Sequence, residues 1–354
     1  RARSRDLMRK GTTMRARTYI SALFGLVAVS AMSKPAGAFE LFADDETAFS
    51  LKGLGEVGMI YEEHSGAAPT RARVGRFQSA QLRMARIAAV GSVEELGAAK
   101  LQIEGRSGSV ELLDLNVAAD VMPWLHVAAG RFKIPVSREF MIPAARMRVS
   151  NRALIREFAP GRGTGLQATA DAHIGELDVE GALGLFQLPG TSFAEDGQLL
   201  TARAVLEPWH HVEIHAAFAE HIFGNGLDAA VAGLEAADQN VFPEDHQLDA
   251  AIGYHGKHLH LLGEGLVSFG PNRGQHPWAA HASAGYLFAV RGVGVEPALA
   301  YDVLQENGQS RQRGATALNV YWDETRLMTT AEYEVEELSG QLTHTASLLV
   351  QAGF

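Results

Sequence analysis

The last ten residues, Thr345-Ala-Ser-Leu-Leu-Val-Gln-Ala-Gly-Phe354, alternate between two kinds of side chain. One face carries the apolar set Ala346, Leu348, Val350, Ala352 and Phe354. The other face carries Thr345, Ser347, Leu349, Gln351 and Gly353, which are mostly polar or small. A period of two is typical of a strand with one apolar face. The stretch therefore predicts a half-apolar strand at this end of the sequence.

The same alternation runs through the chain from Glu46 onward, and turn residues divide it into segments of strand length. We predict sixteen strands, at 47–61, 77–91, 98–106, 111–121, 125–132, 163–172, 176–187, 198–207, 211–222, 247–255, 258–269, 279–290, 293–303, 314–323, 326–336 and 342–354. The alternation changes phase near Met84–Arg86. Because a bulge inserts one extra residue into a strand, this change of phase predicts a β-bulge there.

The connections between these segments alternate between short and long. The longest are predicted at Glu62–Arg76, Lys133–Arg162, Leu188–Gly197, Phe223–His246, Gly270–Trp278 and Leu304–Arg313. Outer-membrane barrels have short periplasmic turns and longer extracellular loops, whereas a soluble sandwich has no reason to lengthen every second connection. The pattern predicts an all-β fold, a transmembrane antiparallel up-and-down β-barrel of about sixteen strands.

The chemistry of a membrane supports closure of this sheet. An open strand edge in hydrocarbon would leave backbone groups unpaired, so a spanning sheet joins its first strand to its last. We expect Leu, Val, Ala and Phe on the outward face, and glycine and small polar residues inside. Aromatic residues at strand ends predict two girdles. Trp124, Trp209 and Trp322 lie at short turns, and Tyr61, Phe77, Phe132, Phe223, Phe269 and Trp278 lie at long-loop ends.

Composition excludes several other classes of protein. The 354 residues contain no cysteine, which excludes a disulfide scaffold, a thiolate metal site and a cysteine nucleophile. Hydrophobic residues make up 47% and charged residues only 20%, so the chain is not disordered.

The first 38 residues have the pattern of a secretory signal peptide. Basic residues follow Met14, an apolar segment runs from Tyr19 to Met32, and Ala36-Gly37-Ala38 matches a cleavage site. Residues before Met14 are interpreted as an upstream extension, and residues 39–354 as the mature barrel. Removing residues 1–38 leaves 23 basic and 40 acidic residues, a net charge of −17. Such an acidic exported protein is not expected to bind nucleic acid.

The segment His126-Val-Ala-Ala-Gly-Arg-Phe-Lys-Ile-Pro-Val-Ser-Arg-Glu139 resembles a hallmark of the phosphate-selective porin O/P family, in which a Gly-Arg-Phe-Lys-x-Pro motif ends a strand and opens a loop folded into the pore. Leu82–Gly91 and Val110–Asp114 resemble that family's second and fourth strands. The terminal Phe354 resembles the assembly signal of bacterial outer-membrane barrels.

This resemblance implies a homotrimeric porin in the outer membrane of a Gram-negative bacterium. Its partners would be outer-membrane lipid, lipopolysaccharide and small anionic solutes, with no cofactor. Phosphate-specific members have clustered lysines at the constriction, whereas the mature chain has only Lys52, Lys100, Lys133 and Lys257. We therefore expect passive diffusion of small hydrophilic solutes with a preference for phosphate or other small anions.

Loop 133–162 is the candidate constriction, because its net charge is +5 in an acidic chain. Its cationic residues are Lys133, Arg138, Arg146, Arg148, Arg152, Arg156 and Arg162. Arg83, Arg131, Arg203 and Arg291 are candidate lumen-facing additions from strands. Cationic side chains in a narrow passage favour anions. The alternative is that these arginines pair with acidic wall residues and hold the loop. The acids in question are Asp114, Asp120, Glu213, Glu264, Glu332 and Glu334.

No motif in the sequence indicates catalysis. Neither a G-x-S-x-G elbow, a P-loop nor an H-E-x-x-H motif is present. His255, His258 and His260 cluster around one turn, with His215 on the preceding strand, and we interpret them as polar lumen residues rather than metal ligands. The chain is not expected to be an enzyme. The remaining alternative function is a non-conducting outer-membrane scaffold or surface barrel.

Overall fold

The computed structural model describes residues 39–43, 47–65, 74–94, 96–106, 108–187, 198–223, 246–269, 276–306, 308–323 and 327–353. The predicted signal peptide at 1–38 and the terminal Phe354 lie outside the described residues. The same is true of most of the long connections at 66–73, 188–197 and 224–245.

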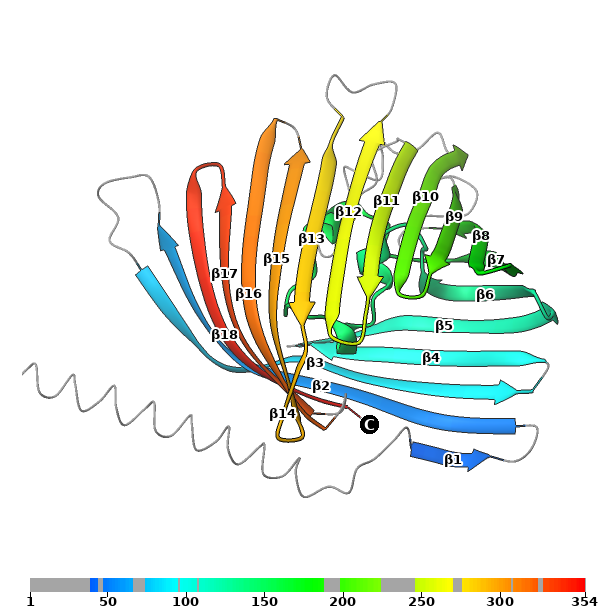
Figure 1. Ribbon diagram of the computed structural model, residues 1–354, viewed down its shortest axis with the longest axis horizontal. Coiled ribbons are helices and arrows are strands. Elements are labelled where there is room, and N and C mark those ends of the chain that lie inside the picture. The colour runs from blue at the N-terminus through cyan, green and yellow to red at the C-terminus, as the bar shows by residue number, and fades with distance from the viewer. Residues whose placement is uncertain are drawn as a thin grey trace, which may run out of the picture.

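Sixteen antiparallel strands close into a barrel, which confirms the predicted fold (Figure 1). The strands of the ring are β2 (Thr47–Ser65), β3 (Val74–Val93), β4 (Gly97–Arg106), β5 (Ser109–Met122), β6 (Leu125–Lys133), β7 (Arg162–Ile174), β8 (Leu177–Gln187), β9 (Gln198–Trp209), β10 (Val212–Phe223), β11 (His246–His255), β12 (Leu259–Phe269), β13 (Trp278–Tyr286) with β14 (Phe288–Val290), β15 (Val293–Glu306), β16 (Gln309–Asp323), β17 (Leu327–Leu338) and β18 (Gln341–Gly353). Closure is made by β18 and β2, which pair from Gly353 opposite Leu54 to Leu342 opposite Ser65.

Three strand predictions need correction. A further strand, β1 (Phe39–Ala43), pairs with the start of β2, where β2 extends beyond the end of β18. The strand predicted at 279–290 is interrupted at Leu287, whose N–H donates to the carbonyl oxygen of His258 and so leaves the ladder. The long connection predicted at Leu304–Arg313 is a tight turn, because the β15–β16 ladder continues until Glu306 pairs with Gln309.

The predicted β-bulge is confirmed one residue before the predicted phase change. Glu56 pairs with Met84 and Val57 pairs with Leu82, so Arg83 is the extra residue in β3. A bulge redirects the side chains around it. The side chains of Arg83 and Arg86 both contact residues inside the barrel: Arg83 contacts Glu56 and Arg86 contacts Glu104.

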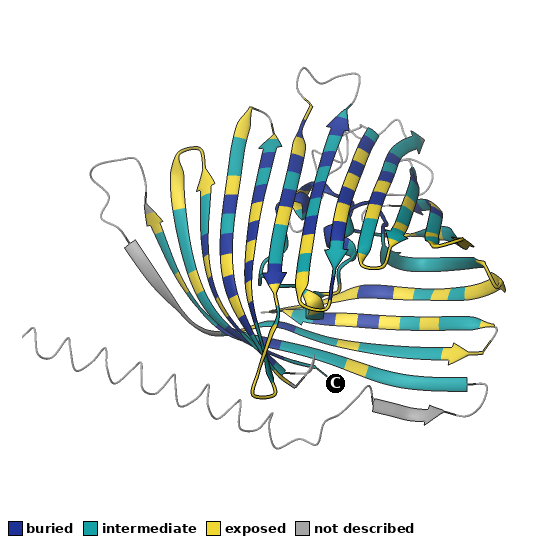
Figure 2. Cartoon of the chain, in the orientation of Figure 1, coloured by how far each residue is buried: buried dark blue, intermediate teal, exposed yellow. Residues whose placement is uncertain are grey.

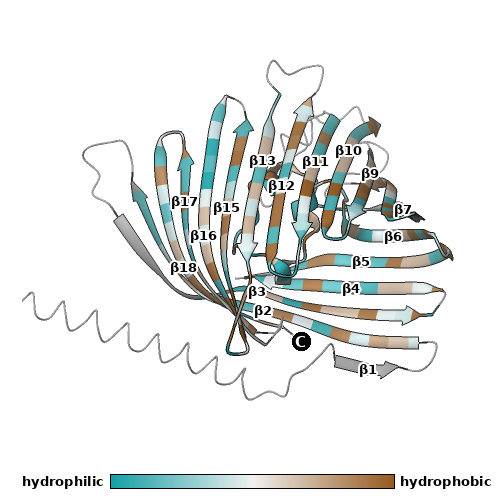
Figure 3. Ribbon diagram, in the orientation of Figure 1, coloured by the Kyte–Doolittle hydropathy of each residue, from teal (hydrophilic) through white to brown (hydrophobic). Residues whose placement is uncertain are grey.

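The outer face exposes apolar side chains along most strands. Leu115 is 53% exposed, Leu183 64% and Leu299 59%, and hydrophobic residues alternate with hydrophilic ones along the ribbons (Figure 3). Trp124, Trp209 and Trp322 are all exposed beside short turns, as expected for a girdle. Within the described residues, no helix is long and apolar enough to cross a membrane.

In one sector, the inner face of the barrel carries large apolar residues where we predicted glycine and small polar residues. Phe186 of β8, Leu199 of β9 and Leu266 of β12 are almost fully buried in a hydrophobic cluster with residues of the connection between β6 and β7. Phe132, which we assigned to an aromatic girdle, instead packs against this inner cluster. Its ring and that of Phe186 form a T-shaped pair with centroids 5.3 Å apart. The side chains of this apolar sector are buried because the connection packs against them. Along the strands, buried inner residues alternate with exposed outer residues, which gives the stripes in Figure 2.

Candidate functional site

The connection between β6 and β7, residues 134–161, folds into the barrel and is called here the lumen loop. It contains the short helices α2 (Arg138–Met141) and α3 (Ile155–Phe158) and the 3₁₀ turn η1 (Ala144–Arg146), drawn as green coils inside the ring of strands (Figure 1). Helix α3 contacts β12, β13 and β15. The loop therefore packs against the inner wall of the barrel, and its role as a constriction stays a prediction.

The Gly-Arg-Phe-Lys-x-Pro motif provides the local reason for this fold. Gly130 has a φ of +122°, and a Cβ there would lie 2.2 Å from the carbonyl oxygen of Leu115. Only glycine fits such a close approach at positive φ. Pro135 has no N–H with which to continue the ladder after Ile134. The N–H of Ile134 donates to Gly161 at 3.0 Å and closes the base of the lumen loop.

One end of the lumen loop is held by acidic residues of β10 and β12. The guanidinium of Arg138 forms a two-pronged ion pair with Glu213, in which Nη2 lies 2.8 Å from Oε2. The carboxylate of Glu264 accepts hydrogen bonds from the Ser137 hydroxyl and from the backbone N–H of Glu139, both at 2.6 Å. Hydrogen bonds to charged groups are the stronger class, so these contacts fix the start of the loop.

The middle of the lumen loop is held by acidic residues of β15 and β17. Arg148 Nε donates to Glu296 of β15 at 2.9 Å. Glu332 of β17 accepts from the backbone N–H and the hydroxyl of Ser150 at 2.5 and 2.6 Å. Asn151 donates to Glu334 at 3.0 Å. The alternative interpretation, that the loop arginines pair with acidic wall residues, thus describes Arg138, whose partner Glu213 belongs to the predicted set of acids. Arg148 also pairs with the wall, but its partner Glu296 lies outside that set.

Four of the predicted site cations surround one aromatic ring. The charged groups of Lys133, Arg152, Arg156 and Arg162 lie 4.9, 5.7, 4.3 and 5.8 Å from the ring centroid of Phe140, which is only 3% exposed. The face of an aromatic ring attracts cations. Lys133 Nζ also donates to the carbonyl oxygen of Ile142 at 3.3 Å, and Arg152 donates to the same oxygen at 2.7 Å. Lys133 and Arg152 therefore help to organise the loop itself. Arg162 also pairs with the wall, because its Nε donates to Asp114 of β5 at 2.8 Å, as the alternative interpretation expects.

The remaining predicted site residues have different surroundings. Arg146 is exposed and has no partner among the described residues. Arg203 pairs with Glu180 on the neighbouring strand. Arg131 lies opposite Leu115, on the sheet face with the exposed outer residues, and its guanidinium contacts Glu111 at 3.6 Å. The prediction of a lumen-facing Arg131 is therefore wrong, because its strand register places it on the outer face. Arg291 lies in the turn between β14 and β15.

A cavity of about 480 Å³ lies between lumen-loop residues 144–152 and the wall formed by β2, β3, β4, β17 and β18. We call it the arginine cavity, because Arg83, Arg86, Arg106 and Arg152 line it with a single lining carboxylate, Glu56. Its other lining residues are Ile60, Gln81, Leu82, Met84, Ala144, Met147, Val149, Ser150, Asn151, Met328, Thr330, Leu349 and Gln351.

Two of these arginines were missed in the sequence. Arg86 and Arg106 both place Nε against the carboxylate of Glu104, which is 1% exposed. Glu104 pairs with Arg86 across the β3–β4 ladder, so they share a sheet face. The bulge at Arg83 could have identified Arg86, because the residues of β3 that face inward after the bulge include Arg86.

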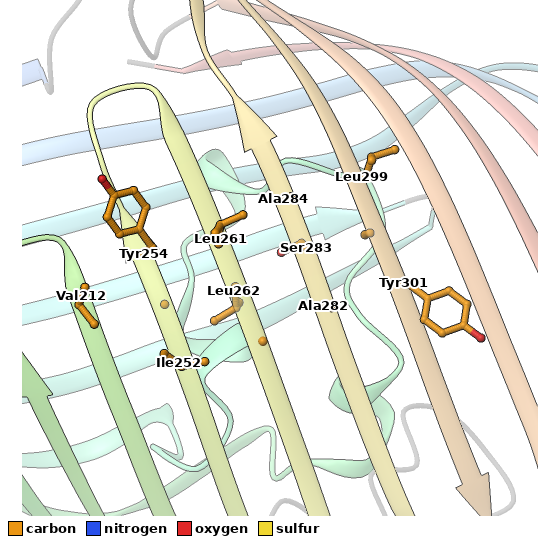
Figure 4. Close-up of a pocket in the computed structure, with 13 residues that line it drawn as sticks. Val212, Ile252, Tyr254, Leu261, Leu262, Ala282, Ser283, Ala284, Leu299 and Tyr301 are labelled. Carbon is orange, nitrogen blue, oxygen red and sulfur yellow. The ribbon is translucent and has the colours of Figure 1, made fainter.

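A second hollow lies on the outer face over β11, β12, β13 and β15 (Figure 4). No charged side chain lines it; the lining residues are Val212, Ile252, Gly253, Tyr254, Leu261, Leu262, Gly263, Ala282, Ser283, Ala284, Leu299, Ala300 and Tyr301. Ile252 and Leu299 are each 59% exposed. The hollow is therefore a mostly apolar part of the outer surface, which fits the face that a barrel turns toward lipid.

The clustered histidines come close to one another without forming a compact ligand set. The rings of His255 and His260 lie 6.4 Å apart, and His258 Nδ1 lies 3.0 Å from the carbonyl oxygen of Leu287. Within the part of the chain that the structure describes, no group of three or more His, Asp or Glu residues could hold a metal ion.

Comparison with known proteins relates the chain to porins by structure alone. No family model matches the sequence, and no curated protein matches it. An anion-selective porin from Comamonas acidovorans has a TM-score of 0.60 at 10% identity, covering 87% of this chain and 100% of that one. OmpF of Salmonella typhi, in complex with daunomycin, has a TM-score of 0.60 at 12% identity, covering 88% and 99%. OprB of Pseudomonas putida has a TM-score of 0.59 at 12% identity, covering 87% and 94%. At such low identity these likenesses show a shared barrel fold.

Proposed function

We propose that this chain is an outer-membrane channel through which small hydrophilic solutes diffuse passively, with a preference for anions. The observation that carries the proposal is the arginine cavity beside the lumen loop, in which four arginines face one lining carboxylate. The closed barrel with an apolar outer face supports a membrane location, since closure and outward apolar residues are what hydrocarbon requires. A Gram-negative outer membrane follows from that location and from the predicted signal peptide at 1–38.

The charges of the arginine cavity favour anions over cations. Arg83 contacts Glu56 at 3.3 Å, Arg86 and Arg106 share Glu104, and Arg152 contacts Glu139 at 3.4 Å. The four guanidinium groups of the cavity are therefore paired with three carboxylates, which leaves an excess of positive charge. Arg146 adds an exposed positive charge from the same loop segment. A narrow passage with low-dielectric walls focuses such a field and raises the local concentration of anions. The net charge of −17 over residues 39–354 as a whole opposes it, so selectivity depends on the constriction.

The resemblance to the phosphate-selective porin O/P family supports the same proposal in finer detail. It favours a homotrimer in contact with outer-membrane lipid and lipopolysaccharide, and phosphate among the solutes. Arginine suits phosphate and carboxylate oxygens alike. Nothing in the arginine cavity favours phosphate over other small anions, so we propose a general anion preference.

Planar-bilayer recording tests the proposal directly. We expect purified, refolded protein to conduct, and its reversal potential in a potassium chloride gradient to have the sign of chloride preference. Arg86→Gln combined with Arg106→Gln should move the reversal potential toward that of potassium. The matched control is Arg131→Gln, which removes a positive charge from the outer face and should leave the potential unchanged.

The outcomes separate the proposal from its alternative. A barrel that inserts into the bilayer without conducting would be a scaffold or surface protein. A conducting barrel with potassium preference would overturn the anion preference while leaving the diffusion channel intact.

A further inference from the structure

We infer that the arginine cavity binds small amphiphilic carboxylates, that is, monoanions in which a carboxylate is joined to an apolar body such as an aromatic ring or a short alkyl chain. The inference rests on the proposed function, because it assumes that the arginine cavity lies on the path of the solute through the channel. It goes beyond charge selectivity, because it assigns one chemical class of anion to the arginine cavity.

The polar side of the cavity can receive one carboxylate. Arg86 and Arg106 use Nε to contact Glu104, and within the described residues their terminal nitrogens have no partner. The side chain of Arg106 is 63% exposed, whereas that of Arg86 is 17% exposed. Two guanidinium groups that share one buried carboxylate retain one net positive charge. Their planar forks match a second carboxylate, which arginine can bind through two parallel hydrogen bonds.

Another part of the cavity lining is apolar and comes from two separate parts of the fold. Met84, Met328 and Leu349 project from the wall and are 8%, 7% and 3% exposed. Met147 and Val149 project from the lumen loop. Methionine is flexible and polarisable, so it adapts to apolar groups of different shape.

Gly58 makes room for this apolar floor. A Cβ at Gly58 would lie 2.1 Å from Cδ2 of Leu349, so the absence of a side chain lets Leu349 lie over β2 beside the cavity. Apolar side chains do not help a hydrated ion such as chloride or phosphate, because such an ion keeps its water. They do favour a solute with an apolar body, since burying that body removes apolar surface from water.

The size of the cavity suits such a solute. A volume of about 480 Å³ lies within the range of about 300–1,000 Å³ in which proteins bind small molecules through an apolar lining and a few placed polar groups. One net positive charge matches a monoanion such as benzoate better than a phosphate dianion, which would need more cationic partners.

Binding and conduction can be measured separately. We would follow benzoate, benzamide and inorganic phosphate by ligand-observed NMR with the folded full chain in detergent micelles, and record chloride currents in planar bilayers with each compound added. We expect benzoate to bind at least tenfold more tightly than benzamide, which lacks the charge, or phosphate, which lacks the apolar body. Benzoate should reduce the chloride current at a correspondingly lower concentration.

Variants distinguish the two sides of the cavity. Arg106→Gln should weaken binding of benzoate at least tenfold. Met147→Gln should weaken binding of benzoate about fivefold and leave the chloride reversal potential unchanged, because it removes no charge. Met122→Gln is the matched control, since Met122 is an exposed methionine at the end of β5, outside the cavity, and benzoate affinity should not change.

Equal binding of benzoate and phosphate, or unchanged benzoate binding in Met147→Gln, would overturn the inference even if the barrel conducts anions. A barrel that binds benzoate in the expected way without conducting would overturn the proposed channel and leave the ligand class standing. Because micelles take up benzoate equally for all variants, the comparison between variants is independent of that uptake.

Discussion

Arg138 and Glu213 lie 75 residues apart in the sequence and form a two-pronged ion pair inside the barrel. Arg138 begins helix α2 of the lumen loop, and Glu213 lies on β10, so the pair joins the loop to the wall. The side chains are only 20% and 13% exposed. An ion pair that is largely shielded from water can hold a loop in place, whereas a fully exposed pair contributes little.

Glu213→Gln tests this relationship, because glutamine keeps the shape and removes the charge. Arg138 would then be left without its ion pair, which costs about 1–3 kcal/mol for a hydrogen bond to a charged group. We expect the lumen loop to move more, and single-channel recordings to show larger and noisier conductance. Glu111→Gln, which loses a pair with Arg131 on the outer face, should conduct as the natural protein does. Identical traces for Glu213→Gln would mean that the ion pair does not restrain the loop.

Phe140 is expected to organise the cations of the lumen loop through its ring. Phe140→Leu keeps an apolar side chain and removes the ring, so four neighbouring positive charges lose an attraction worth about 0.5–1 kcal/mol each at most. We expect limited trypsin digestion to cleave faster after Arg152 and Arg156, as followed by mass spectrometry. Phe140→Tyr retains a ring and should be cleaved at the natural rate. Equal cleavage of both variants would show that packing alone holds this part of the loop.

Arg146 should be accessible from solution, unlike Arg148. The chain has no cysteine, so a single introduced cysteine reacts alone. Arg146→Cys should react rapidly with a negatively charged methanethiosulfonate, and the added charge should reduce the chloride preference measured by reversal potential. Arg148→Cys is the control, because its position is 21% exposed and held against Glu296. Slow reaction at position 146 would show that Arg146 does not line the passage.

Phe186 anchors the apolar sector of the inner wall. Phe186→Ala would leave a void under the lumen loop, and losses of this kind cost about 3–5 kcal/mol in well-packed cores. We expect a lower temperature for the conversion from the folded to the unfolded band in gel electrophoresis. Phe288→Ala removes the same number of atoms from a position that is 47% exposed and should change this temperature little. If both variants unfold at the same temperature, the inner cluster does not stabilise the barrel.

Strand positions could be predicted because their signal is local. The alternation of Val212, Ile214, Ala216 and Phe218 with polar or small residues places β10 within one residue at each end. The phase change near Met84–Arg86 likewise located the bulge to within one residue, since the extra residue is Arg83. The position of the lumen loop was also predicted, because residues 134–161 interrupt the alternation and follow the Gly-Arg-Phe-Lys-x-Pro motif. The structure shows that Gly130 of this motif has a positive φ and no room for a Cβ.

The partners of the loop cations could not be predicted in the same way. Arg148 and Glu296 are 148 residues apart, and they meet only because the barrel closes β18 onto β2. The apolar inner sector was missed for a related reason. Phe186 and Leu266 alternate like residues of any strand, and nothing in that pattern states that the loop will cover their inward face.

The division of the chain into sixteen strands, the closure of the sheet and the long cationic segment that leaves it could all be inferred from local patterns. These features depend on side-chain period and turn residues, which act over a few neighbouring positions. The arginines that line the cavity were identified from the folded barrel, because its closure and the bulge at Arg83 set the face and the partners of each side chain. Arg86 and Arg106 around Glu104 therefore became part of the candidate site, and Arg131 did not.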